Sequence, residues 1–160
     1  MKFGLKKGKI TIALLFSVLF IFMTAGFVSA VTIDANNYAA AGGNHYNSIR
    51  GNAQGNSALH LSTNSAVNYN INLQANRLYT IIVSYSNDGG SDVIGLALNN
   101  VVDIGKFRTV STGSGGYGWN TFTNSQVMYF KTKNAGQYTL TIWVPSADSY
   151  GVELNTITIN

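Results

Sequence analysis

The stretch VNYNINLQANRLYTIIVSY, residues 67–85, contains the two patterns that decide the fold class. Val67, Tyr69 and Ile71 alternate with three asparagines, which is typical of a β-strand with one face in water. From residue 78 to residue 85 both alternating sets are mainly apolar or aromatic, which favours a central strand covered on both faces. The stretch therefore predicts two strands, and it shows no helical periodicity.

Similar strand patterns continue toward the C-terminus, with turn-forming residues between them. Strands are predicted at 93–98, 101–104, 126–131, 138–144 and 152–159, and turns at Asn87–Gly90, Asn99–Asn100 and Asn134–Gly136. Eight or more short strands with no βαβ pattern predict an all-β fold, a two-sheet jelly-roll sandwich. Two longer stretches, 39–57 and 111–122, are predicted to be irregular loops, where binding residues usually concentrate.

The first thirty residues have the pattern of a secretory signal peptide. Four lysines precede an apolar run from about residue 10 to residue 28, and Val28-Ser29-Ala30 supplies small residues for cleavage. We therefore expect residues 1–30 to be removed, leaving one domain, 31–160, that is secreted or held at the cell surface. If the segment is retained instead, its length approaches that of a membrane anchor, and it is the only membrane contact we expect.

Charge and composition exclude several classes of partner and reaction. Outside the signal segment six basic residues balance six acidic residues, so no electrostatic footprint for nucleic acid is present. The chain has no cysteine, and His45 and His60 lack the spacing of a zinc protease. No nucleophile elbow or phosphate-binding loop occurs, and the acids are scattered. We therefore predict a protein that is not an enzyme.

Aromatic residues in the loops are the best candidates for a binding site. Tyr117 and Trp119 lie in a Gly/Ser-rich loop, where a large ring is costly to expose unless a ligand or the protein covers it. Trp119 either stacks on a sugar ring or folds back to plug the sandwich end. Tyr46 either lines the same loop end or is structural, and Trp143 is either exposed on a sheet face or covered by a loop.

The order of short motifs resembles the β-sandwich carbohydrate-binding modules of families 6 and 35 over nearly the whole predicted domain. No single motif is specific, but their order is hard to produce by chance. The similar segments are Ile33–Asn36 with Gly42-Gly43, LYTIIVSYSN (78–87), NNV (99–101), GWNTF (118–122), AGQYTL (135–140) and GVELNTI (151–157).

This resemblance implies a jelly roll that binds polysaccharide in a cleft at the loop end, with a second site on the concave sheet. By position, Trp119 would stack on the sugar, Tyr46 would face it, and Trp143 would serve the sheet-face site. Glu153 stands where the family has a sugar-binding asparagine. A carboxylate accepts hydrogen bonds strongly but cannot donate them, so the preferred sugar is expected to differ or the cleft to be unused.

The resemblance also implies a structural calcium ion near the chain ends, at Asp34, Asn36 and Asn155. The family prefers carboxylates at all three positions, whereas this chain has one acid and two amides. Because calcium affinity falls as charged ligands are lost, we expect a weak site or none. In the absence of calcium, these groups are expected to hydrogen-bond the first and last strands together.

Two functions remain open at this point. The first is non-catalytic binding of an extracellular polysaccharide or cell-surface glycan by stacking and hydrogen bonding. The alternative is a structural subunit of a surface layer, matrix or filament built on the same sandwich. Its low-charge strands lack the lysines and prolines that usually prevent edge pairing, so self-association is expected in that case.

Overall fold

The computed structural model describes residues 29–113 and 116–160, and strands dominate it. The predicted signal segment lies outside this part except for its last two residues. The elements in chain order are β1 (Val31–Asp34), β2 (Ala40–Gly42), β3 (His45–Ile49), a short 3-10 turn (Gln54–Asn56), β4 (Ser57–Leu61), β5 (Ala66–Leu73), β6 (Leu78–Ser86), β7 (Val93–Leu98), β8 (Val102–Arg108), β9 (Thr123–Asn124), β10 (Met128–Lys131), β11 (Gly136–Ser146) and β12 (Val152–Ile159).

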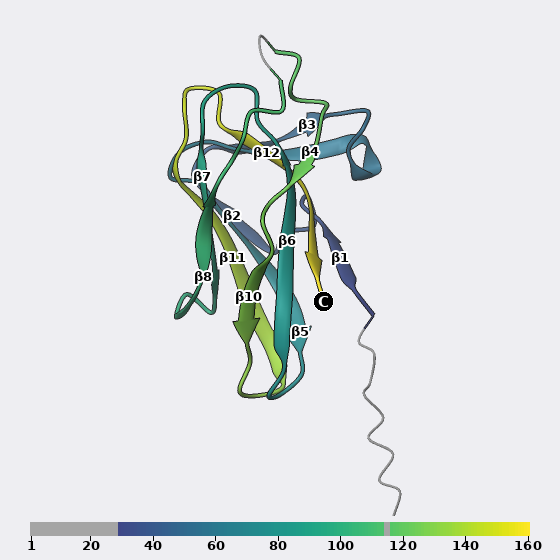
Figure 1. Cartoon of the computed structure of the whole chain (residues 1–160), viewed down its shortest axis with the longest axis vertical. Coiled ribbons are helices and arrows are strands. Elements are labelled where there is room, and N and C mark those ends of the chain that lie inside the picture. Colours follow the sequence, from purple (N-terminus) through teal and green to yellow (C-terminus); the bar gives the residue numbers. More distant parts are fainter. Residues whose placement is uncertain (1–28, 114–115) are drawn as a thin grey trace, which may run out of the picture.

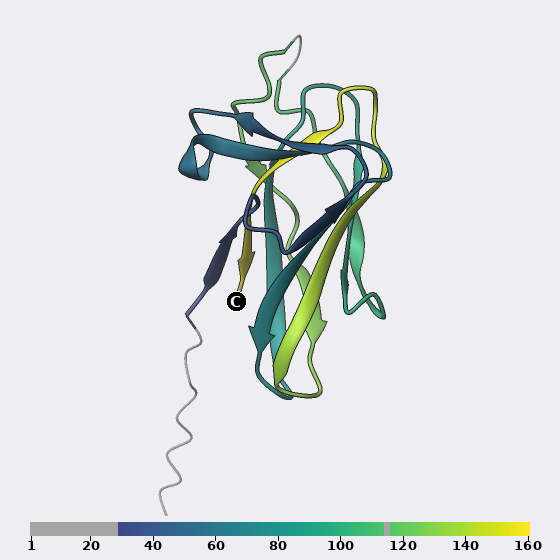
Figure 2. The same cartoon turned by 180° about the vertical axis from the view of Figure 1, so that it is seen from behind.

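The strands form two antiparallel sheets that face each other (Figures 1 and 2). One sheet has the order β10-β6-β12-β4-β3, with β1 paired to β12 and β9 paired to β6; the other has the order β2-β5-β11-β7-β8. Non-consecutive neighbours such as β6 and β12 require long connections that cross the sandwich ends. The predicted two-sheet jelly-roll sandwich is confirmed.

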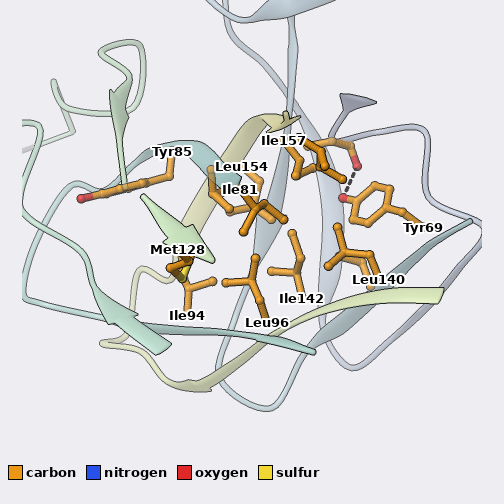
Figure 3. Close-up of a cluster of buried hydrophobic side chains, with 14 of the residues drawn as sticks. Tyr69, Ile81, Tyr85, Ile94, Leu96, Met128, Leu140, Ile142, Leu154 and Ile157 are labelled. Carbon is orange, nitrogen blue, oxygen red and sulfur yellow. Dashed lines mark hydrogen bonds between the residues drawn. The ribbon is translucent and has the colours of Figure 1, made fainter. Parts of the chain in front are cut away.

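The core lies between the sheets and is built from alternate residues of each strand. Leu140, Ile142 and Val144 of β11 are fully buried and pack in one cluster with Leu96 of β7 and Leu154 of β12. Figure 3 shows these layers meeting, and a dashed line marks the hydrogen bond from the hydroxyl of Tyr69 to the carbonyl oxygen of Ala35 (2.7 Å). This bond fastens the segment after β1 to the core.

Most predicted strands are confirmed, and the tight turn at Asn99–Asn100 is confirmed by the backbone. Both asparagines have positive φ (50° and 55°), and the backbone N–H of Val101 donates to the carbonyl oxygen of Leu98 (3.0 Å), which closes a tight turn in the three-residue connection between β7 and β8. The prediction for residues 78–85 is only half right. The inner face of β6 is buried, but its outer face is partly exposed, and 62% of Leu78 is accessible to solvent.

The prediction of an irregular loop at 39–57 is wrong. This stretch contains β2, β3 and the 3-10 turn, and both strands lie at sheet edges. An edge strand can satisfy its backbone on one side while both side-chain faces stay wet, so no apolar alternation marks it. The other predicted loop, 111–122, has no strand in its described residues, as expected.

Among the described residues, no helix is long and apolar enough to cross a membrane.

Candidate functional site

A cleft of about 300 Å³ lies at one end of the sandwich, where β3 and β4 meet two loops. In Figure 1 the β8–β9 and β11–β12 loops lie at this upper end, next to β3 and β4. The cleft is lined by Asn44, Tyr46, Arg50, His60, Ser62, Trp119, Ser149, Tyr150 and Glu153. The structure thus brings Tyr46, Trp119 and Glu153 together, although they are far apart in the sequence.

The rings of Tyr46 and Trp119 both contact the imidazole of His60. Tyr46 and His60 are direct partners in the β3–β4 ladder, and their rings stack 4.3 Å apart at an interplanar angle of 16°. The ring of Trp119 also lies near the His60 imidazole, with centroids 5.9 Å apart and an interplanar angle of 57°. Half of Tyr46 is exposed and Trp119 is partly exposed, so both rings offer surface to a ligand. Trp119 is therefore not a buried plug.

The carboxylate of Glu153 forms the floor of the cleft and is fully buried. Arg50 binds it with both arms of its guanidinium: Nε lies 2.6 Å from Oε2, and Nη2 lies 2.6 Å from Oε1. The central carbon of the Arg50 guanidinium, Cζ, lies 5.8 Å from the centre of the Trp119 ring, within the range of a cation–π contact. Glu153 therefore holds Arg50, and Arg50 in turn lies against Trp119.

The charge on Glu153 is stabilised despite its burial. Burial acts to raise the pKa of this carboxyl, but the nearby imidazole of His60, the guanidinium of Arg50 and the hydroxyl of Ser48 outweigh it and lower the pKa below its usual value. Nδ1 of His60 lies 3.9 Å from Oε1, at the long end of an ion pair. Glu153 is thus an anion already satisfied by protein groups, so it does not offer a sugar the free acceptor that the resemblance implied.

Sequence reasoning missed Arg50, His60 and Tyr150. Arg50 and His60 were missed because β3 and β4 were not recognised, so their pairing could not be seen. Tyr150, which is 62% exposed, lies in the polar β11–β12 loop. An exposed aromatic in a polar loop is the signal that identified Trp119, and it could have identified Tyr150 as well.

The other two predicted carbohydrate-binding residues lie outside this cleft. Tyr117 is 85% exposed on the same loop as Trp119, but it does not line the cleft. Trp143 lies on the outer face of β11, half-buried, with its ring directly over Gly95 of β7. The amine of Lys106 lies 5.9 Å from the ring centre, so this tryptophan is packed on the sheet itself.

The residues predicted to hold calcium do not fit that ion. Oδ1 of Asp34 accepts hydrogen bonds from the backbone and side-chain nitrogens of Asn36 (2.9 and 3.1 Å), and Oδ1 of Asn155 accepts one from the backbone of Gln54 (2.8 Å). The buried Oδ1 of Asn36 has no partner, but one free amide oxygen and one carboxylate fall far short of six to eight ligands. Contrary to the expectation without calcium, these side-chain bonds do not join the first and last strands; the backbone ladder between β1 and β12 does that. No group of three His, Cys, Asp or Glu side chains in the described ranges is placed to hold a metal ion.

Comparison with known proteins identifies the fold. No protein-family model matches the chain, and neither does the sequence of any curated protein. Solved structures do match. They include the C-terminal family 6 carbohydrate-binding module of LamC, a laminarinase of Zobellia galactanivorans (TM-score 0.70, 18% identity, 82% of this chain and 99% of that one). The fold is that of carbohydrate-binding modules.

Two further solved modules agree with this assignment. One is a module of lichenase 5A from Cellvibrio mixtus, solved with cellotriose (TM-score 0.68, 19% identity, 81% of this chain and 95% of that one). The other is a family 35 module from Clostridium thermocellum (TM-score 0.68, 16% identity, 82% of this chain and 98% of that one). The predicted resemblance to families 6 and 35 is thereby confirmed at the level of the fold.

Proposed function

We propose that this protein binds a polysaccharide or cell-surface glycan outside the cell, without cleaving it, through the cleft described above. One observation carries the proposal: Tyr46, Trp119 and Tyr150, from three separate segments, converge on one cleft among polar side chains. A pyranose has a face of C–H groups and a rim of hydroxyls. Exposed rings suit the face, and the polar groups of the cleft suit the rim.

The dimensions and polar groups of the cleft favour a short stretch of glycan. Its volume of about 300 Å³ is at the lower end of the range of roughly 300–1,000 Å³ found for ligand pockets. Arg50, Asn44, Ser62 and Ser149 line it and can donate to hydroxyl or ring oxygens. Because Glu153 is neutralised by Arg50, the cleft carries little net charge, and we propose an uncharged sugar.

The same arrangement argues against bond cleavage. A glycosidase of the usual kind needs two carboxyl groups that flank the glycosidic bond. Glu153 is the only carboxylate among the residues that line the cleft, and both its oxygens are bound to Arg50. The site can therefore hold a sugar, but it lacks a free acid and base.

The outer face of the second sheet is proposed as a secondary surface for the same ligand. Trp143 provides a half-exposed ring there, and the neighbouring polar groups include Thr141, whose hydroxyl is 2.9 Å from Oδ1 of Asn68 and 2.8 Å from Oδ1 of Asn100. Trp143 does not line the cleft at the loop end. We therefore expect it to contribute weak contacts to long polymers.

A glycan-array screen of the protein without residues 1–30 tests the proposal, with hits measured again by calorimetry. We expect binding to a limited set of neutral glycans and no release of sugar from the bound polysaccharide. An absence of binding to any glycan, combined with concentration-dependent assembly into larger particles, would favour the structural-subunit alternative.

A further inference from the structure

Two short turns lie side by side next to the cleft. The first runs from Arg50 to Ala53 and is closed by the backbone N–H of Ala53, which donates to the carbonyl oxygen of Arg50 (3.0 Å). The second runs from Gly118 to Thr121 and is closed in the same way, by the N–H of Thr121 and the carbonyl oxygen of Gly118 (3.0 Å). Each turn carries a residue that lines the cleft, Arg50 in the first and Trp119 in the second.

Two hydrogen bonds connect the turns, and both run from Asn52 to Asn120. The backbone N–H of Asn52 donates to Oδ1 of Asn120 (2.9 Å), and the side-chain amide of Asn52 donates to the backbone carbonyl oxygen of Asn120 (2.9 Å). Each asparagine is the third residue of its turn, and each side chain bonds to the backbone of the other residue. We call this pair the asparagine clamp. The turns are close, since a Cβ atom on Gly51 would lie 4.0 Å from Nδ2 of Asn120.

The turn that carries Arg50 is attached on its other side to β12. The guanidinium of Arg50 binds the buried carboxylate of Glu153 with two bonds of 2.6 Å. The backbone N–H of Gln54, directly after the turn, donates to Oδ1 of Asn155 (2.8 Å). Because Glu153 and Asn155 both belong to β12, this turn is fixed to the sheet at two points. The asparagine clamp therefore joins the Trp119 turn to a support that is itself attached to the core.

The Trp119 turn has two further hydrogen bonds, but neither joins it to the other turn. The hydroxyl of Ser86 donates to the carbonyl oxygen of Trp119 at 3.3 Å, which is long for a hydroxyl donor. Oγ1 of Thr112 lies 2.9 Å from the carbonyl oxygen of Gly118 and 3.0 Å from that of Asn87, and a hydroxyl has one proton for both acceptors. The position of the turn relative to the guanidinium therefore depends on the clamp.

We propose that Asn120 is a positioning residue that acts through Asn52 to hold the Trp119 ring beside Arg50, so that this wall of the cleft is formed before a glycan binds. A ring that is already in place loses less conformational entropy on binding than a ring that must first be ordered. Neither asparagine lines the cleft, so the clamp acts on Trp119 and does not contact the sugar. The benefit to binding rests on the proposed function, whereas the position of the ring does not.

The clamp is expected to affect the position of the ring more than the stability of the fold. Both asparagines are exposed, and a hydrogen bond that water can replace contributes little net stability. A purely structural role would appear mainly as a lower melting temperature. A positioning role appears as a change at Trp119 while the melting temperature stays nearly the same.

Quenching of tryptophan fluorescence by acrylamide tests the ring position without any glycan. The chain has two tryptophans, so Trp143→Phe leaves Trp119 as the reporter. In this background Asn120→Ala removes the Oδ1 acceptor, and we expect a higher quenching constant because the ring loses its support and becomes more accessible. Asn120→Asp keeps an acceptor oxygen at the same place and is the matched control, expected to be quenched like its parent.

A second variant tests whether Asn120 acts through its partner. Asn52→Ala removes the other bond of the clamp from a residue far from Trp119 in the sequence, and it should raise the quenching constant as well. Calorimetry with the neutral glycan that binds best on the array then measures the consequence for binding. We expect Asn120→Ala to lower the affinity about threefold to tenfold, and Asn120→Asp to restore it.

Four results would overturn the proposal. Quenching of Asn120→Ala equal to that of its parent would show that the clamp does not hold the ring. A change in Asn120→Asp as large as in Asn120→Ala, or no change in Asn52→Ala, would show that the bonds between the turns are not the cause. Raised quenching with unchanged affinity would remove the role in binding. If no glycan binds at all, the proposed function fails, and the quenching constants alone decide whether Asn120 positions the ring.

Discussion

Arg50 and Glu153 form a two-bond ion pair beneath the cleft, with Nε–Oε2 and Nη2–Oε1 distances of 2.6 Å each. They are 103 residues apart in the sequence, and Arg50 follows β3 directly while Glu153 lies in β12. Because the glutamate side chain is 1% exposed and the arginine side chain 28%, the pair has a buried anion and a cation that reaches the surface. The pair therefore couples the stability of the fold to the shape of the cleft.

Removing the arginine is expected to be more harmful than neutralising the glutamate. Arg50→Ala leaves a buried carboxylate without its main partner, which should lower the free energy of unfolding by about 3 kcal/mol. Glu153→Gln keeps the shape and removes the buried charge, so a smaller loss is expected. Urea denaturation of both variants measures the difference. A loss below about 1 kcal/mol for Arg50→Ala, as for an exposed pair, would show that the pair contributes little.

The raised pKa of the Asp92 carboxyl should make the free energy of unfolding depend on pH. Burial, assisted by the charge of Asp148, raises its pKa to about 6 in the folded state, against about 3.9 when unfolded. Between these values the folded protein binds more protons, so stability should fall as the pH rises through this window. Urea denaturation in the presence of a chelator measures this trend. Asp92→Asn should flatten it, and an identical slope in both proteins would contradict the assignment.

A single hydroxyl is expected to matter in the core. Tyr69→Phe removes the hydrogen bond to the carbonyl oxygen of Ala35 and leaves that buried acceptor unpaired, at a cost of about 1–3 kcal/mol. Tyr138→Phe is the matched control, because its hydroxyl bonds to the carbonyl of Asn134 at an exposed site. Thermal and urea unfolding compare the two. Equal losses in both variants would mean that burial of the Tyr69 bond has no special role.

If the sheet face around Trp143 is a secondary binding surface, its loss should lower the affinity for long polymers but not for short oligosaccharides. If Trp143 adds a second contact for polymers, Trp143→Ala should weaken binding to the polysaccharide about tenfold or more while leaving the affinity for a short oligosaccharide unchanged. Affinity electrophoresis with the polymer and calorimetry with the oligosaccharide provide the two values. Weaker binding of both ligands, or of neither, would show that the sheet face around Trp143 adds no separate contact for long polymers.

The fold could be predicted because its central strands alternate strongly. Residues 67–72 have apolar residues at every second position, as a strand with one core face does. Residues 152–159 alternate in the same way on either side of a one-residue shift between Leu154 and Thr156. Turns such as Asn99–Asn100 have residues that tolerate positive φ. The edge strands β2 and β3 could not be predicted in this way, because neither face of an edge strand needs to be apolar.

The candidate site was predicted only in part for the same reason. Tyr46 and Trp119 were found as aromatics in loop-like surroundings, and the structure places both in the cleft. The stacking of Tyr46 on His60 depends on the register between β3 and β4, and the Arg50–Glu153 pair depends on how far-apart segments meet. Local patterns contain neither kind of information.

The most direct test of glycan binding in the cleft is the affinity of ring variants for the best ligand from the array. Trp119→Ala and Tyr46→Ala should each lower the affinity at least about tenfold, or 1.4 kcal/mol, as measured by calorimetry. Tyr117→Ala, on the same loop but outside the cleft, should bind like the parent protein. Unchanged binding by folded Trp119→Ala and Tyr46→Ala would contradict the account and place the ligand elsewhere on the sandwich.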